Sequence, residues 1–305
     1  MSADAHCRPY APPDFAEVYA VISAATDMDR TRRVNAVTLQ TALDEQLIGA
    51  TVAVNQDQAV VGIVTVEPLD RGYMLQGWVH PGWRGQGAGS ALLCAAEDDL
   101  RRRIAKRTGC IARVYSDIPG VEALFLSQDY GETRRFYNMS VRLVDHGVAA
   151  TVPPGVTLKP FEPGDLEALV EADNEFFADH WGSQPRSLSE WRYQLIDSRP
   201  HDPTLWVIAW HNDKIIGECL CHASLQGAPG DGWIAIVGVT RQWRGRGVGR
   251  AVLASGLQQL HRAGFETASL HVDAENAPAI HLYRSLGFEV ARTRLHYRKV
   301  IIPAR

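Results

Sequence analysis

The sequence has few cysteines, no long apolar run and no excess of positive charge. Its five cysteines among 305 residues are scattered and odd in number, which favours free thiols in a reducing, cytoplasmic compartment over a disulfide framework. No apolar run is long enough to span a membrane and no signal-peptide pattern is present, so we expect no membrane partner. The net charge of −4 argues against nucleic acid as a partner.

Metal-ligand spacing is also missing. The eleven histidines follow no pattern typical of a metal site, and the pair Cys219 and Cys221 has no second pair to close a tetrahedral site. On a strand these two cysteines share a face while His222 points the other way. We therefore interpret them as core residues and expect no metal.

The most informative part of the chain is the segment 233–264. Residues 233–239 are apolar and rich in β-branched side chains, which predicts a buried strand. Apolar residues recur at helical spacing from 251 to 260. A glycine-rich turn between them therefore leads into a helix N-terminus, where free N–H groups and the helix dipole favour an anion such as phosphate.

Three glycine-rich loops compete for this turn. A P-loop requires a lysine that is absent here, and a dinucleotide fold requires a third glycine where Val252 stands. The pattern present is Arg-x-x-Gly-x-Gly at residues 244–249. After it comes Asn276, followed by Ala-x-x-x-Tyr-x-x-x-Gly-Phe at residues 279–288.

These two motifs together resemble the GNAT N-acetyltransferase superfamily, which implies acetyl-CoA as co-substrate and a small-molecule amine as acceptor. By resemblance, backbone N–H groups of Val237 and Val239 hold the pantetheine arm and the thioester carbonyl. The resemblance implies further coenzyme contacts by Arg244, Gly245, Arg246, Gly247, Val248, Gly249, Arg250 and Asn276.

Tyr283 falls at the superfamily's acid position and is the expected catalytic residue. A phenol is a competent proton donor to a leaving thiolate. Packing against an apolar helix face is the alternative interpretation of this tyrosine. Asn276 likewise has a simpler interpretation as the residue that begins a helix.

The chain repeats itself. Residues 8–15 return as 159–166, and residues 84–89 return as 244–249. We therefore predict two tandem GNAT-fold domains, 1–148 and 153–305, each α/β with a mixed sheet and helices on both faces. The coenzyme-binding residues expected in the first copy are Gly77, Val79, Arg84, Gly85, Gln86, Gly87, Ala88 and Gly89.

The first copy lacks the acid. Phe125 aligns with Tyr283, and Asp117 is the polar residue nearest to the position of Asn276. Because phenylalanine cannot donate a proton, we expect the first copy to bind acetyl-CoA at most and the second copy to catalyse.

The base that deprotonates the acceptor amine is left open. Candidates are Glu218, Asp231, Asp179, His180 and His222. Among tandem members the chain is most similar to the mycothiol synthase-like acetyltransferases, whose acceptor segment matches Asn174, Phe177, Ala178 and His180. It departs from them at Trp233, where those enzymes carry a glutamate that serves as base.

An aromatic group formed by Phe176, Phe177, Trp181 and Trp191 either lines an acceptor pocket or packs between helices. The leading hypothesis is an acetyl-CoA-dependent N-acetyltransferase of a small amine, a cytoplasmic acyltransferase. The alternative is a non-catalytic acyl-CoA-binding sensor or scaffold. Nucleotide or nucleic-acid binding is a third hypothesis, resting on the glycine loops and on the arginines at 101–103, which we interpret as a solvated helix end.

Overall fold

The computed structural model describes residues 5–31, 34–143, 150–180, 183–197, 202–223 and 230–304. It contains two compact units, Met1–Phe136 with Arg292–Arg305, and Tyr137–Ala291. This division differs from the predicted boundary near residues 148–153, because segments of each half of the sequence belong to the other unit. Part of the predicted linker, residues 144–149, lies outside the described residues.

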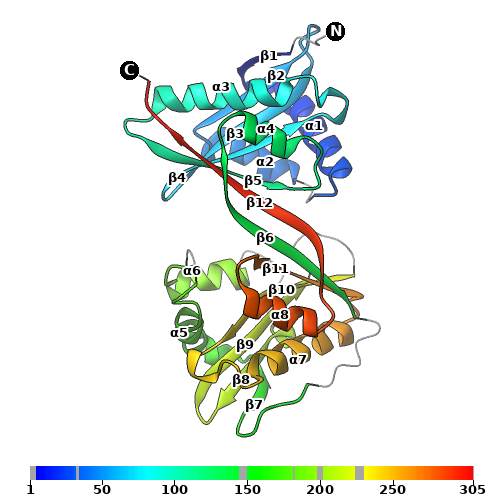
Figure 1. Cartoon of the computed structure of the whole chain (residues 1–305), viewed down its shortest axis with the longest axis vertical. Helices are drawn as coiled ribbons and strands as arrows, with labels where there is room; N and C mark the ends of the chain where they lie inside the picture. The colour runs from blue at the N-terminus through cyan, green and yellow to red at the C-terminus, as the bar shows by residue number, and fades with distance from the viewer. Residues whose placement is uncertain are drawn as a thin grey trace. The chain divides into compact units, whose positions relative to one another are not determined.

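The first unit contains strands and helices in the expected order (Figure 1). Its strands are β1 (His6–Pro9), β2 (Gly49–Val54), β3 (Val60–Leu69), β4 (Gly72–Val79), β5 (Thr108–Tyr115) and the start of β6 (Gly131–Arg142). Its helices are α1 (Phe15–Met28), α2 (Ala36–Thr41), α3 (Ala88–Arg103) and α4 (Val121–Ser127).

The second unit repeats this order. Its strands are the end of β6, then β7 (Thr157–Pro160), β8 (Val207–His211), β9 (Lys214–Ala223), β10 (Asp231–Val239) and β11 (Thr267–Asp273). Its helices are α5 (Leu166–Phe176), α6 (Leu188–Arg192), α7 (Val248–Arg262) and α8 (Ala277–Ser285). The last strand, β12 (Glu289–Ile301), begins in this unit and continues into the first.

The strands follow the order β1-β2-β3-β4-β5-β12-β6-β11-β10-β9-β8-β7. β4 and β5 run parallel, as do β10 and β11, whereas β2–β3, β3–β4, β8–β9 and β9–β10 are antiparallel. The predicted mixed α/β sheet built from two tandem GNAT regions is therefore confirmed.

Helices cover both faces of the second unit's sheet. A methyl group on Gly232 would lie 2.7 Å from Leu260 of α7, and one on Gly238 would lie 2.6 Å from Phe176 of α5. The two cysteines predicted to be core residues, Cys219 and Cys221, are buried on the α7 face with their sulfur atoms 3.7 Å apart.

The strand β12 completes the first unit although it ends the sequence. Residues Arg294 to Ile301 pair antiparallel with β5 (Figure 1). Leu295, Tyr297 and Ile301 enter the core cluster that α3 and α4 share with β3–β5. The first domain copy therefore depends on the last residues of the second for its core, which no local sequence pattern indicates.

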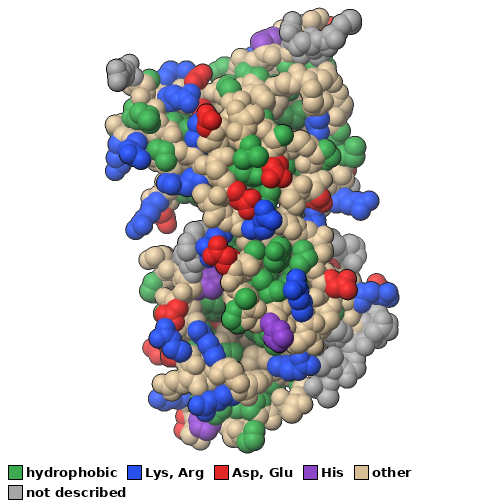
Figure 2. Space-filling view, viewed as in Figure 1, with side chains coloured by type: hydrophobic (Ala, Val, Ile, Leu, Met, Phe, Trp, Pro, Cys, Tyr) green, Lys and Arg blue, Asp and Glu red, His purple; other side chains and the backbone are tan. Residues whose placement is uncertain are grey.

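The arginine run ends α3, as expected of a solvated helix end. Arg101 pairs with Glu97 and Asp98, and Arg102 and Arg103 pair with Asp99. Lys and Arg side chains are interspersed with Asp and Glu over the visible face of each unit (Figure 2). Within the described residues no helix is long and apolar enough to cross a membrane.

Candidate active site

The strands β10 and β11 pair only at their beginnings. Their parallel register covers Asp231–Thr267, Gly232–Ala268 and Trp233–Ser269, and no later pairs follow. A bulge between Ile234 and Ile236 lies just beyond the last of these pairs. The second half of β10 therefore exposes a free edge in the part of the sheet that leads to the glycine-rich loop.

Val237 and Val239 direct their backbone N–H groups to this free edge. The N–H of Thr240 bonds to the carbonyl oxygen of Ile216 in β9 at 3.0 Å. Because alternate residues of an antiparallel ladder bond to the same neighbour, Gly238 also faces β9 and the two valines face away from it. These are the two donors that the sequence predicts for a thioester and its pantetheine arm.

The loop after β10 has the backbone geometry that a phosphate cradle requires. Gly245 and Gly247 have φ values of 72° and 87°, in the left-handed region that glycine adopts at little cost. Gly247 caps α7 without any side-chain hydrogen bond, so the first N–H groups of this 15-residue helix have no side-chain acceptor at its cap. A pyrophosphate fits these donors and the positive end of the helix dipole.

Arg244 holds this loop to its neighbours. Its Nε donates to the Val239 carbonyl at 3.0 Å, and its Nη2 donates to the Phe176 carbonyl at 2.7 Å. Thr240 donates to Glu175, and Arg241 pairs with Asp179. The arginine of the motif therefore joins the end of β10 to the end of α5 with its side chain, which leaves its backbone for any coenzyme contact.

The other predicted loop residues have mixed surroundings. The Arg246 guanidinium lies 5.2 Å from the Trp243 ring centroid, and Arg250 donates to Ser285 at 2.7 Å. Val248 is fully buried, and Gly249 packs where a methyl group would lie 3.4 Å from Leu282. Asn276 caps α8 by accepting from the Ala279 N–H at 3.2 Å.

Tyr283 lies on α8, buried in the core of the second unit. It packs against Phe288 with ring centroids 5.8 Å apart. Burial, with a smaller contribution from nearby Cys219, raises the pKa of the phenol above its ordinary value. The phenol therefore stays protonated at neutral pH, as a general acid must.

The first unit repeats the loop geometry. Gly85 and Gly87 have φ values of 72° and 90°, and β4 pairs with β5 only from Tyr73 to Leu75. Arg84 donates to the Val79 carbonyl at 3.3 Å and forms a bidentate pair with Asp29 at 2.7 and 2.8 Å. The other predicted members, Gly77, Gln86, Ala88 and Gly89, lie on β4, in the loop and at the start of α3.

The first unit differs at the acid position. Phe125 stacks on Tyr297 of β12 at 5.2 Å and meets Tyr130 edge-on at 5.3 Å. Asp117 binds Arg292 at 2.6 Å, and Arg292 also donates to the Arg30 carbonyl. An aromatic cluster and an ion pair therefore occupy the positions that Tyr283 and Asn276 hold in the second unit.

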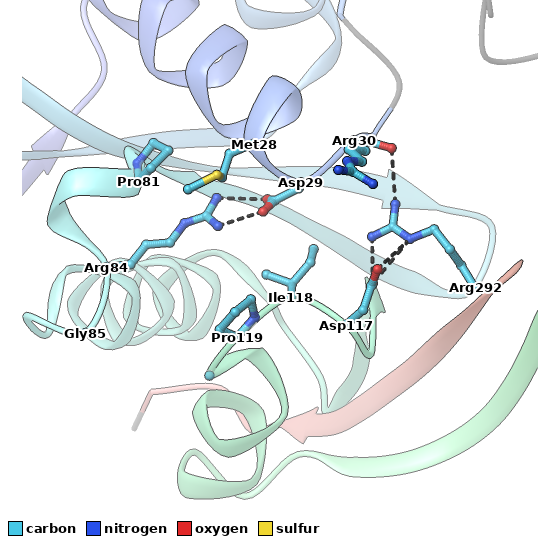
Figure 3. Close-up of a pocket in the computed structure, with 11 residues that line it drawn as sticks. Met28, Asp29, Arg30, Pro81, Arg84, Gly85, Asp117, Ile118, Pro119 and Arg292 are labelled. Carbon is cyan, nitrogen blue, oxygen red and sulfur yellow. Dashed lines mark hydrogen bonds and ion pairs between the residues drawn. The ribbon is translucent and has the colours of Figure 1, made fainter.

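A cavity of about 670 Å³ lies in the first unit beside its loop (Figure 3). The ion pairs Arg84–Asp29 and Arg292–Asp117 line it together with Arg30. Its apolar lining comes from Met28, Pro81, Ile118 and Pro119. A small molecule with an anionic group matches this combination.

Glu218 is the most perturbed of the base candidates. It is fully buried opposite Gly238, and burial followed by the nearby Asp173 carboxyl raises its pKa well above the ordinary value. Asp173 in turn binds Arg186. Neither carboxyl oxygen of Glu218 has a hydrogen-bond partner within the described residues, and burial favours its protonated form, so Glu218 is a weaker candidate for the base.

The remaining base candidates are also engaged or enclosed. Asp231 accepts from Thr267 and Ser269, both at 2.8 Å, and lies six residues before Val237, about 17 Å along the strand because the bulge takes up one residue. Asp179 pairs with Arg241. His222 is buried against Trp206, and His180 packs edge-on against Phe177.

The four residues of the predicted aromatic group do not share one location. Phe176 and Phe177 lie within 3.3 Å of the position that a methyl group on Gly238 would occupy, whereas Trp191 is fully buried against Trp206. Trp181 lies outside the described residues. Of the three described members, Phe176 and Phe177 thus lie beside the second half of β10.

Sequence reasoning missed three features of this region. Arg186 is held by Asp173 and by both amide atoms of Asn174, at 2.9 Å each, which fixes the segment after α5. Arg292 reaches the first unit from the last strand. His271 lies against Trp233, and the strict alternation of polar and apolar residues in 267–273 is the signal that locates it. Among the described residues no cluster of three or more His, Cys, Asp or Glu side chains could hold a metal ion.

Sequence comparison defines the class. The profile of the acetyltransferase (GNAT) family matches residues 14–119 and 166–288, so both halves carry it. The chain belongs to the GNAT acetyltransferase family and is a tandem GNAT protein. Members of this family use acetyl-CoA, which fits the cradle and the free strand edge described above.

Individual members of the family are similar to this chain over most of its length. The chain is 31% identical to the mycothiol acetyltransferase of Thermobispora bispora, over 94% of this chain and 97% of the relative. It is 34% identical to that of Streptomyces scabiei over 72% and 69% of the two chains.

Solved structures agree on the fold. A GCN5-related N-acetyltransferase from Sphaerobacter thermophilus superposes with a TM-score of 0.76 at 28% identity, covering 99% of this chain and 97% of the other. A tandem GNAT protein from the clavulanic acid biosynthesis pathway gives a TM-score of 0.72 at 16% identity, covering 99% and 100%. At that identity the second likeness supports the fold alone.

Proposed function

We propose that the second unit transfers the acetyl group of acetyl-CoA to the amine of a small molecule, and that the cysteinyl amine of a glucosaminyl-inositol conjugate is the acceptor. The similarity to mycothiol acetyltransferases over nearly the whole chain supports this acceptor. The observation that carries catalysis in the second unit is the difference between its buried Tyr283 and the stacked Phe125 of the first.

Each group of residues in the second unit has its own role in the reaction. The loop from Arg244 to Gly249 and the start of α7 hold the pyrophosphate. The N–H groups of Val237 and Val239 hold the pantetheine arm and polarise the thioester carbonyl, where negative charge develops during attack. Tyr283 donates its proton to the departing thiolate, so that the free thiol leaves.

The first unit takes a different role. Its loop and cavity bind acetyl-CoA without transfer, because Phe125 has no proton to give. This assignment is supported by the matching Gly85 and Gly87 geometry and by the cavity beside them.

Free-thiol release from acetyl-CoA tests the transfer. The acceptor panel contains aminoglycosides, polyamines, amino acids, protein N-termini and the cysteinyl-glucosaminyl-inositol amine. We expect turnover with the last of these and little with the others. If only another amine of the panel were acetylated, that amine would be the acceptor and the cysteinyl-glucosaminyl-inositol amine would be excluded. An absence of turnover with all of them, while acetyl-CoA still binds, would favour the sensor hypothesis over the enzyme.

A further inference from the structure

The strand β11 presents a polar face. Thr267, Ser269, His271 and Asp273 alternate with Ala268, Leu270 and Val272, which are buried. Ser269 pairs with Trp233 in parallel register, so their side chains share one face. The polar side chains of β11 therefore lie on the same face as Trp233.

This is the face that α5 covers. Trp233 is opposite His222 in β9, and His222 shares a strand face with Glu218, which lies opposite Gly238. Gly238 in turn approaches Phe176 of α5. An acceptor that reaches the free edge of β10 from this side meets the polar face of β11.

His271 lies where the two strands separate. It follows the last paired residue, Ser269, by two positions, about 7 Å. Val237 lies three ladder positions beyond Trp233, about 10 Å, because the bulge after Ile234 adds one residue to β10. The imidazole meets the Trp233 ring edge-on, with centroids 4.6 Å apart, and the residue is half-buried. About 3 Å along the strand direction therefore separates the levels of His271 and Val237, which places the imidazole beside the edge where the amine would attack.

We propose that His271 is the general base that removes the proton from the acceptor amine, an inference that rests on the proposed acetyl transfer. As the amine nitrogen attacks, a C–N bond forms and the C–S bond breaks. The amine proton passes to the imidazole, directly or through one water, and the Tyr283 proton passes to the sulfur. Solvent then returns the imidazole and the phenol to their starting states.

Its surroundings suit this task better than those of the other candidates. The charged or titratable groups on the covered face are Asp231 of β10, His222 and Glu218 of β9, Asp173 of α5 and Asp273 of β11. β6, which lies next to β11, carries Tyr137 and Arg142 on opposite faces. Asp231 is bound by two hydroxyls, and Glu218 is enclosed. Imidazole is the side chain whose ordinary pKa, about 6.5, lies closest to neutral pH.

The test compares H271Q with the wild type and with H281Q, which changes an exposed histidine on α8. We expect kcat/KM for the amine to fall by about 10²–10⁴-fold in H271Q only, with acetyl-CoA affinity and melting temperature retained. In H271Q, the acid limb of the plot of kcat/KM against pH should move toward the pKa of the amine substrate. An H271Q enzyme within about threefold of wild type, with the same acid limb, would overturn the proposal.

A second measurement does not depend on turnover. Imidazole NMR signals of the full chain, assigned by their loss in H271Q, are followed from pH 5 to 8 with and without acetyl-CoA. The His271 signal should titrate in this range and shift when acetyl-CoA is added. A signal that does neither would exclude His271 as the base, whereas a wild type that titrates as expected but acetylates no amine would remove only the proposed function.

Discussion

Gly238 lies directly opposite Glu218 in the ladder between β10 and β9, and a methyl group on Gly238 would come within 2.9 Å of Glu218 Oε1. The same methyl group would lie 2.6 Å from Phe176 Cδ2. The glycine thus brings a buried carboxyl group and the end of α5 against the backbone of β10, between the two valines whose N–H groups face the free edge.

Replacing Gly238 with alanine should therefore destabilise the second unit. Because both close contacts are to buried groups, we expect a loss of about 1–3 kcal/mol of unfolding free energy, together with weaker acetyl transfer. Denaturant unfolding measures the first and thiol release the second. The control is G131A in β6, where a methyl group meets nothing within 4 Å; equal stability of the two variants would contradict the expectation.

The substitution E218Q should change the pH dependence of stability. The pKa of Glu218 is raised in the folded protein, so its stabilising contribution is complete below the unfolded-state pKa and is lost as pH rises through the folded value. Glutamine cannot ionise. The melting temperature of E218Q relative to wild type should therefore increase steadily from pH 5 to pH 9, and a constant difference would show that Glu218 is ionised throughout.

The substitution Y283F should remove the acid while leaving the coenzyme site intact. We expect kcat to fall by about 10²–10⁴-fold with unchanged acetyl-CoA affinity, and Y193F, at an exposed tyrosine, to behave as wild type. Because burial raises the pKa of Tyr283 above its ordinary value, ionisation of this phenol should cause no loss of wild-type activity up to about pH 10. Turnover retained in Y283F would exclude Tyr283 from the mechanism.

A matched pair of substitutions separates the two loops. Gly247 and Gly87 begin α7 and α3 with φ values of 87° and 90°, so alanine strains both backbones, by about 1 kcal/mol. With catalysis in the second unit, G247A should raise the KM for acetyl-CoA while G87A leaves it unchanged. The opposite pattern would place catalysis in the first unit. Isothermal titration of each variant then shows how many coenzyme sites remain.

Much of the architecture followed from local patterns. The apolar run at 233–239 became β10, the helical periodicity from 251 became part of α7, and the internal repeat became two units with matching loops. These succeed because strand, turn and helix depend on residues close in sequence. The positions of the loop glycines could also be predicted from the sequence, because a left-handed backbone before a helix is a local requirement.

The contacts of individual side chains could not be predicted from local sequence patterns. The guanidinium of Arg244 joins the end of β10 to the end of α5, and the motif by itself does not indicate these two contacts. Asp231 was one of the five candidate bases, and the structure shows that hydroxyls of β11 hold it at the start of β10. Such assignments depend on which distant segments pack together.

The sequence by itself determined the family, the duplication and the difference between Tyr283 and Phe125, because each is a matter of residue type at a fixed spacing. Only the tertiary structure decided that β12 enters the first unit, that Glu218 is sealed opposite Gly238 and that His271 lies against Trp233 where two strands part. Strand pairing, burial and the loss of hydration that shifts a pKa come from contacts between segments far apart in the chain, and these exist only once it has folded.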